Sequence, residues 1–422
     1  MKAPLHQPMR DGFYPRLAEL MMCAPWERLG ELGVSAVSTA LAAERLSVQN
    51  FLALLSPAAE PHLEAMARKA RAATLRHFGR TVQLFTPLYL ANLCTNHCLY
   101  CGFSALHRIS RSKLTLDEVE MEAKAIAASG LRRILALTGD APTKTGADYL
   151  ADCVAVLARY FSSVGIEVPS MSTGEYAKIV AAGADSMTLF QETYNEALYA
   201  QVHPAGPKRD FSFRLDAPQR AVEGGLRGIN LGPLLGLDDW RRELFLVGMH
   251  ADFLSQRYPH IEISLSLPRL RPCGDLPSGT EDIFSPQTIS DRHFVQALTA
   301  FRCFLPHAGI TLSTREPASL RDRLIPLGVT RVSAGVSTAV GGHTVHKVQA
   351  KGVAGMNNDA SQFDISDHRS VAQMAEAIHL MGYQPVFADW VLSGDGRAGL
   401  SVGQASALGT RSRTDVQDRV LA

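Results

Sequence analysis

The 422-residue chain has almost no net charge and no long apolar run. Its 42 Lys and Arg residues nearly balance 41 Asp and Glu residues, so no overall field attracts nucleic acid or an anionic membrane. No segment approaches the roughly 18 apolar residues of a membrane span. Residues 1–17 are polar, are interrupted by proline and lack the apolar core of a signal peptide. We therefore expect a cytoplasmic protein that binds neither nucleic acid nor membrane.

Cysteine is also scarce, and the count of seven is odd, which argues against a secreted disulfide framework. Cys153 and Cys303 lie in apolar helical patterns, where we expect them to be buried in packing. Cys94, Cys98 and Cys101 differ, because they share one polar stretch, NLCTNHCLYCGF. This group needs a chemical explanation.

Short apolar runs, each followed by a helical pattern, recur from residue 82 onward. The runs are 82–90, 133–138, 166–171, 186–191, 228–232, 261–267, 309–314 and 330–335. The first intervening helix has a capping box, Thr115 with Glu118, and stops at Gly130. The alternation predicts an α/β fold, a TIM-type (βα)8 barrel, rather than a doubly wound sheet.

The sequence outside these runs suggests four segments. Residues 1–80 are predicted to form an N-terminal helical extension, including a basic helix whose Ala, Met and Leu stripe packs on the barrel. The barrel is predicted over 81–350, followed by a segment that packs on it, 351–391. Residues 392–422 are rich in Gly, Ser and Ala without a period, which is typical of a flexible tail.

Unusual residues follow several predicted strands, at the barrel face where TIM-type enzymes place their chemistry. These segments are the cysteine loop, TGDAP, QETY, PRLRPC and TREP. Five such segments on one face predict an active site there. Within PRLRPC, Arg269 and Arg271 alternate with proline and leucine, and either face the pocket or tie the barrel rim together.

The spacing C-x3-C-x2-C is compatible with zinc or with an iron–sulfur cluster. Structural zinc takes four ligands, and the fourth would be His97, His107 or a remote residue. His97 lies between two of the cysteines and could hardly reach the same ion. Catalytic zinc accepts three ligands, but this loop is an unusual way to supply them. A [4Fe–4S] cluster held by three cysteines keeps one iron open, as catalysis at the cluster requires.

The sequence C-x3-C-x-Y-C-G-F after the first barrel strand resembles the radical S-adenosylmethionine (SAM) superfamily. The resemblance implies that Cys94, Cys98 and Cys101 hold a [4Fe–4S] cluster whose fourth iron is chelated by SAM. It also implies that Tyr100, with Phe103 nearby, packs near the SAM adenine.

Further blocks over most of residues 80–390 resemble the aromatic amino-acid lyases of this superfamily, in particular the 2-iminoacetate synthases of thiazole (thiamin) biosynthesis. The blocks include LTGDAP, LFQETYNEALYAQVHPAGPKRDF, SLPRLRPC, LSTREPASLRDRLIPLGV and VSAGVSTAVGGH. The resemblance implies cleavage of the Cα–Cβ bond of L-tyrosine to 2-iminoacetate (dehydroglycine) and p-cresol by means of a 5′-deoxyadenosyl radical.

The resemblance also assigns SAM-binding residues, Thr138, Gly139, Asp140, Gln191 and Arg214, and it makes Glu192 a catalytic residue. The segment 138–140 would meet the methionyl amine, although the family more often has Glu where this chain has Asp140. Gln191 and Glu192 would face the ribose or the reacting centre. Arg214 would meet the SAM carboxylate, where a planar bidentate donor fits. Glu192 could instead pair with Arg214.

For the substrate, Arg315 is the predicted partner of the α-carboxylate, since guanidinium supplies two parallel donors. An ion pair with Glu316 is the alternative, although neighbouring residues at a strand end point to opposite sides. Tyr89 and Ser333 match family positions that line the amino-acid end of the substrate.

Three other functions are alternatives to tyrosine cleavage. A relative that makes carbon monoxide and cyanide for hydrogenase maturation needs a second cluster on a C-terminal cysteine motif, and no cysteine follows Cys303. A tryptophan lyase shares Tyr89, Arg315 and Ser333, but its cysteine motif usually lacks the YCGF form. A non-enzymatic zinc protein is a third possibility. The preferred resemblance implies a flavodoxin or ferredoxin as electron donor and a thiazole synthase as partner.

Overall fold

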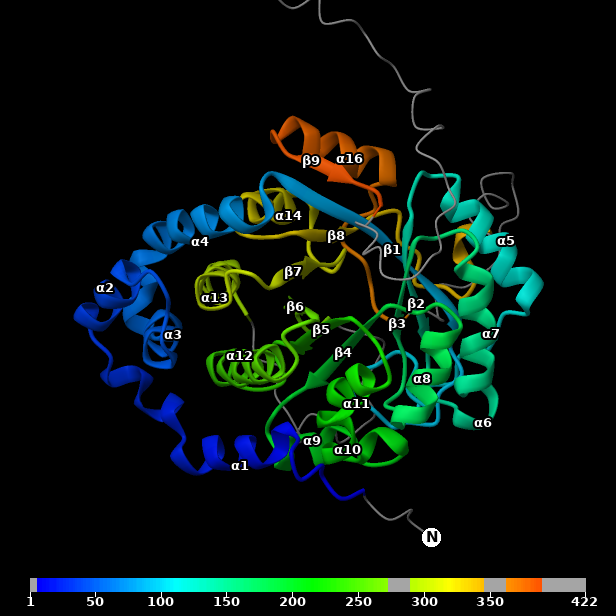
Figure 1. Cartoon of the computed structure of the whole chain (residues 1–422), viewed down its shortest axis with the longest axis horizontal. Coiled ribbons are helices and arrows are strands. Elements are labelled where there is room, and N and C mark those ends of the chain that lie inside the picture. The colour runs from blue at the N-terminus through cyan, green and yellow to red at the C-terminus, as the bar shows by residue number, and fades with distance from the viewer. Residues whose placement is uncertain (1–5, 272–288, 345–361, 389–422) are drawn as a thin grey trace, which may run out of the picture. The chain divides into compact units, whose positions relative to one another are not determined.

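The computed structural model describes residues 6–271, 289–344 and 362–388. Its strands β1 to β8 are all parallel, pair in chain order and close into a barrel because β1 pairs with both β8 and β2 (Figure 1). The predicted TIM-type (βα)8 fold is confirmed. The strands are β1 (Thr81–Ala91), β2 (Arg133–Thr138), β3 (Ser163–Glu167), β4 (Ser186–Glu192), β5 (Gly228–Pro233), β6 (Glu262–Ser266), β7 (Gly309–Leu312) and β8 (Arg331–Ser333).

The third strand is the one that the sequence placed wrongly. It was predicted over 166–171, but β3 runs from Ser163 to Glu167 and pairs with β2 along this whole length. The sequence does not predict the start of this strand, because Ser163 and Gly165 are not typical strand residues. Its end comes early, since Pro169 has no N–H for a ladder. Glu167 therefore lies at the carboxyl end of the strand rather than inside it.

Helices surround the barrel on its outer side (Figure 1). Thr115 and Glu118 form the predicted capping box of α5. None of the helices within the described ranges is long and apolar enough to cross a membrane. The helices between the strands are α5 (Leu116–Ala127), α6 (Pro142–Thr145), α7 (Ala147–Leu157), α8 (Thr173–Ala181), α9 (Glu196–Val202), α10 (Phe211–Leu215), α11 (Ala217–Glu223), α12 (Trp240–Arg257), α13 (Asp291–Phe304) and α14 (Ala318–Leu324).

The residues before the barrel are helical, with aromatic packing against its outer helices. Phe51 stacks on Phe304 of α13 at a centroid distance of 4.3 Å and meets Phe301 edge-on at 6.0 Å. The predicted basic helix is α4, which buries Met66 and Ala70 and exposes its basic face. These helices are α1 (Phe13–Cys23), α2 (Val34–Ala42), α3 (Val48–Leu55) and α4 (Leu63–Phe78).

The segment after the barrel returns to it through α16 (Val371–Leu380) and β9 (Gln384–Val386). β9 pairs with the start of β1, outside the closed barrel. A buried ion pair between Arg321 of α14 and Asp367 fastens this segment, and Arg321 also donates to the Ser333 carbonyl at the end of β8. The predicted boundary at 350 and the predicted tail, 392–422, lie outside the described residues.

Replacing Asp367 by Asn is expected to lower the free energy of unfolding by about 3 kcal/mol, because it leaves the Arg321 charge buried without a counter-ion. Arg321 and Arg369 hold the pKa of Asp367 down to about 2, so the stabilisation is present above about pH 4 and is lost towards pH 2. Denaturant unfolding at pH 7 measures the change. Asp322→Asn, a half-exposed partner of Arg369, should cost under about 1 kcal/mol, and equal effects would contradict the assignment.

Candidate active site

The cysteine loop follows β1 and lines an open cavity at the carboxyl end of the barrel. Cys94, Cys98 and Cys101 all line this cavity. Burial raises the pKa of the Cys98 and Cys101 thiols, so a bound cation is needed to keep them as thiolates. Cys153 and Cys303, in contrast, are buried in the packing core as predicted.

The arrangement of the three thiols agrees better with a cluster than with a single zinc ion. Among the described residues, no three His, Cys, Asp or Glu side chains converge closely enough to hold one metal ion. An iron–sulfur cluster binds each cysteine through a separate iron, so it requires no such convergence. Three cysteines in one cavity therefore fit a [4Fe–4S] cluster with one open iron.

Asn96, which the sequence analysis did not select, fixes the cysteine loop from within. Its amide nitrogen donates to Asp140 Oδ2 at 2.8 Å, and its oxygen accepts from the Lys208 backbone at 2.8 Å. The Thr95 backbone N–H also donates to the Asp140 carbonyl at 2.8 Å. Asn96 thus ties the cysteine loop both to the segment after β2 and to the segment after α9. Its position within the cysteine motif was the only signal in the sequence that could have identified it.

The TGD segment after β2 lies directly against the cysteine loop. A Cβ atom on Gly139 would come within 2.3 Å of the Leu93 carbonyl oxygen, so only glycine allows this close approach. Thr138 Oγ1 and Asp140 Oδ1 are buried without a hydrogen-bond partner in the described part of the chain. Thr138, Gly139 and Asp140 all line the cavity, so these polar atoms are available to a ligand amine.

Two aromatic side chains of the motif line the same cavity. The Tyr100 hydroxyl lies 2.7 Å from His203 Nε2, and burial lowers the pKa of that imidazole, which keeps it neutral. Phe103 packs edge-to-face on Tyr89, with a centroid distance of 5.7 Å. Both rings border the space predicted for SAM. Phe103 also contacts Tyr89, which is predicted to line the substrate site.

The end of β4 is irregular, and this decides which of its side chains reach the cavity. The pairing with β5 shifts register between Phe190 and Glu192, and Glu192 has a left-handed φ of 72°, which is rare for a residue other than glycine. Phe190 and Glu192 therefore both line the cavity, whereas Gln191 lines neither this cavity nor the one inside the barrel. Both amide atoms of Gln191 are buried without a hydrogen-bond partner among the described residues, and its contact with SAM stays a prediction.

Glu192 is held by two cations in the cavity wall. Lys208 Nζ lies 2.6 Å from Glu192 Oε1, and Arg214 Nη2 lies 3.6 Å from the same oxygen. Arg214 also donates from Nε and Nη2 to the Phe190 carbonyl, at 2.9 and 2.6 Å. The alternative pairing of Glu192 with Arg214 is thus present, but the closer partner is Lys208, which the sequence analysis missed.

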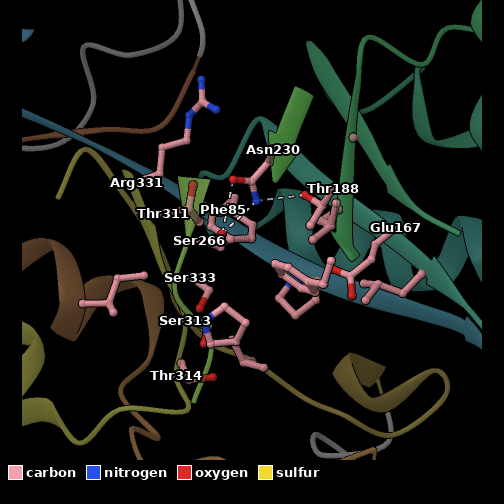
Figure 2. A pocket seen from close by; sticks show the side chains of 18 of the residues that line it. Phe85, Glu167, Thr188, Asn230, Ser266, Thr311, Ser313, Thr314, Arg331 and Ser333 are labelled. Atoms are coloured by element: carbon pink, nitrogen blue, oxygen red, sulfur yellow. Dashed lines mark hydrogen bonds between the residues drawn. The ribbon is translucent and has the colours of Figure 1, made fainter. Parts of the chain in front are cut away.

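A second cavity occupies the inside of the barrel (Figure 2). TIM-type barrels normally fill this space with side chains. Here Gly165, Ser186, Gly228 and Ser264 line it and leave it open. Figure 2 shows Asn230 on its wall, with its amide nitrogen 3.2 Å from Thr188 Oγ1 and 2.9 Å from Ser266 Oγ.

The two cavities adjoin, because they share part of their lining. The shared residues are Tyr89, Leu137, Glu167, Thr188, Phe190, Pro268, Arg315, Gln362 and Phe363. A molecule in the barrel cavity therefore lies next to whatever occupies the cysteine cavity. Glu167, Gln362 and Phe363 were not selected from the sequence.

Arg315 is placed in this shared lining, as expected of a substrate-binding residue. Its guanidinium lies 3.5 Å from the centroid of the Phe363 ring, which covers one of its faces. Glu316 does not pair with it but binds Arg269 and Arg271 instead. The two open questions have thus been answered: Arg315 faces the cavity, and Arg269 and Arg271 tie the barrel rim together.

Tyr89 and Ser333 also line the barrel cavity. The Tyr89 hydroxyl lies 2.7 Å from Gln362 Oε1 and donates to it. Ser333 Oγ is buried and has no hydrogen-bond partner among the described residues, so it can bind a polar group of a ligand. Two of the predicted substrate residues therefore reach the cavity beside Arg315.

Comparison with known proteins agrees with this site. The Radical SAM superfamily model matches residues 88–246, and the Biotin and Thiamin Synthesis associated domain matches residues 266–384. The fold and the cysteine site define a radical SAM enzyme, with a [4Fe–4S] cluster and SAM as cofactors.

The 2-iminoacetate synthase of Escherichia coli K12 is 39% identical over 355 residues, which cover 84% of this chain and 90% of that protein. The chain therefore belongs to the 2-iminoacetate synthase family of lyases.

Solved structures show the same architecture. The hydrogenase maturase HydG of Carboxydothermus hydrogenoformans is 32% identical and superposes with a TM-score of 0.74 over 89% of this chain and 83% of that one. A second HydG structure, 28% identical, has a TM-score of 0.77 over 90% of this chain and 81% of that one.

Proposed function

We propose that this lyase cleaves the Cα–Cβ bond of L-tyrosine, giving 2-iminoacetate and p-cresol. The observation that carries the proposal is the position of Arg315 in the lining shared by the cysteine cavity and the barrel cavity. A buried guanidinium at this place binds an α-carboxylate, and the hollow barrel beside it accommodates an aromatic side chain. The 39% identity to a 2-iminoacetate synthase supports the same reaction.

The cofactors, when bound, supply a 5′-deoxyadenosyl radical that takes a hydrogen atom from the substrate amino group. The residues of the chain position the reactants. Cys94, Cys98 and Cys101 hold the cluster, and Arg315 orients the substrate carboxylate. Phe363 covers one face of the guanidinium, and the ring of strands surrounds the substrate on its sides.

The same proposal includes the protein's partners and pathway. Reductive cleavage of SAM takes one electron, so a flavodoxin or ferredoxin is the proposed donor. The short-lived 2-iminoacetate product implies a thiazole synthase as the partner that consumes it, in thiamin biosynthesis. The match to the Biotin and Thiamin Synthesis associated domain supports this assignment.

A tryptophan lyase is the second candidate, because Tyr89, Arg315 and Ser333 line the barrel cavity in the way that either substrate would need. The relative that serves hydrogenase maturation would need a second cluster on a C-terminal cysteine motif. No cysteine follows Cys303, so the second cluster expected of that relative has no ligands in the sequence.

Anaerobic incubation of the reconstituted enzyme with SAM, a one-electron reductant and each aromatic amino acid tests the proposal. We expect p-cresol and glyoxylate, the hydrolysis product of 2-iminoacetate, from tyrosine, together with 5′-deoxyadenosine. Product identification by mass distinguishes the candidates. An indole-derived acid from tryptophan, with no p-cresol from tyrosine, would contradict the tyrosine assignment.

A further inference from the structure

Glu167 ends β3 and lines both the cysteine cavity and the barrel cavity. Among the described residues, no hydrogen bond or ion pair engages its carboxylate. In the closed order of strands, β3 lies opposite β7, the strand that Arg315 follows. Figure 2 shows the Glu167 side chain on the other side of the barrel cavity from Ser333 and Ser313. An acid and a guanidinium thus border the same space from opposite walls.

Glu192, the other acid that acts on Glu167, is already paired. Glu192 binds Lys208 and lies near Arg214, and neither Arg315 nor Glu167 has an ion-pair partner in the described ranges. Burial, with a smaller contribution from Glu192, raises the pKa of Glu167 to about 7, although Arg315 opposes the rise. The charged and titratable groups around Glu167 are Arg315, Glu192, Arg214, Lys208 and Tyr89.

An α-amino acid brings one anion and one cation into the cavity, and a buried charge is costly unless it is paired. Arg315 is the counter-ion for the carboxylate. We propose that Glu167 binds the α-ammonium group of the substrate and accepts its proton. This inference rests on the proposed function, in which the reaction starts at the amino nitrogen.

The proposed step balances without any electron transfer. One N–H bond of the ammonium group breaks, an O–H bond forms on the Glu167 carboxylate, and the amine becomes neutral. Glu167 lines the cavity in which SAM binds as well as the barrel cavity, so a substrate nitrogen beside it lies at the border between the two. Glu167 is therefore a catalytic residue, which binds the substrate ammonium group as Arg315 binds the carboxylate.

Binding to the oxidised holoenzyme with SAM, without reductant, tests the proposal independently of turnover. The two ligands are L-tyrosine and 3-(4-hydroxyphenyl)propionate, which has the same ring and carboxylate but no amino group. We expect the wild-type affinity for tyrosine to rise as the pH passes upward through about 7, because Glu167 becomes ionised. Glu167→Gln should weaken tyrosine binding about 10- to 100-fold, remove this rise and leave propionate binding within about twofold.

Glu243→Gln is the matched control. Glu243 is also buried, with its pKa raised to about 7, but it lines neither cavity and accepts instead from Thr193 Oγ1 and the Tyr194 backbone. This variant should keep the pH dependence of tyrosine binding. Visible cluster absorbance of Glu167→Gln confirms that the variant is folded.

Tyrosine affinity of Glu167→Gln within about twofold of wild type would overturn the proposal, as would an equal loss of propionate binding. If the wild-type enzyme makes no p-cresol, the proposed function fails on its own. The comparison of tyrosine with its desamino analogue still decides whether Glu167 binds an ammonium group.

Discussion

Cys98→Ala is expected to abolish reductive cleavage of SAM, so that 5′-deoxyadenosine falls to the background of a protein-free control. Three cysteines line the cavity, and a cluster that is meant to keep one iron open has no ligand to spare. Cys98 is the most deeply buried of the three, so no water or neighbouring side chain can readily replace its sulfur. Iron content, visible absorbance and 5′-deoxyadenosine after anaerobic reconstitution measure the effect.

Cys303→Ala is the control, because this thiol is equally buried but packs in the core on α13, away from the cysteine cavity. It should keep wild-type iron content and SAM cleavage, apart from a modest loss of stability from the small cavity it creates. Continued production of 5′-deoxyadenosine by Cys98→Ala would refute the cluster assignment.

Patterns that depend on local chemistry were predictable from the sequence. The spacing of the three cysteines was sufficient to predict a cluster site. The alternation of apolar runs with helical patterns was sufficient to predict the barrel. Arg315 could be placed because it comes shortly after a strand, where parallel barrels collect their polar residues, and Asp140 because its segment resembles the family's.

Residues whose place depends on the exact end of a strand were harder to find. Glu167 was overlooked because the predicted third strand, 166–171, enclosed it, whereas β3 ends at this residue. Gln191 was predicted to face SAM, but a regular strand would not bring both Phe190 and Glu192 inward and leave Gln191 out of the cavity lining. The register shift and the left-handed φ of Glu192 do so, and neither has a sequence signature.

Other contacts between distant segments have no signal in the sequence. Lys208 pairs with Glu192 because the loop after α9 folds back over the cysteine loop, where Asn96 holds the Lys208 backbone. Phe363 covers Arg315 although many residues separate them. These contacts follow from tertiary packing, so sequence motifs and hydrophobic periodicity do not predict them.

Arg315→Lys is expected to raise the KM for tyrosine about 10- to 100-fold while cluster content stays at the wild-type level. Lysine keeps the charge but offers a point donor instead of a planar fork, and loss of one charge-assisted hydrogen bond costs about 1.5–3 kcal/mol. Stacking on Phe363 is weakened as well, because the flat guanidinium is gone. Arg315→Gln, without the charge, should have the larger effect.

Arg241→Lys provides the comparison, since Arg241 lines neither cavity and binds Glu60 and the Leu55 carbonyl outside the barrel. It should leave KM within about twofold of wild type, because a partly exposed ion pair contributes little. Steady-state kinetics separate KM from kcat, and SAM cleavage in the absence of tyrosine shows that the cofactor site is intact. If Arg315→Lys binds tyrosine as tightly as the wild-type enzyme, the carboxylate must have another partner, and the nearest candidates in the shared lining are the Tyr89 hydroxyl and the Gln362 amide.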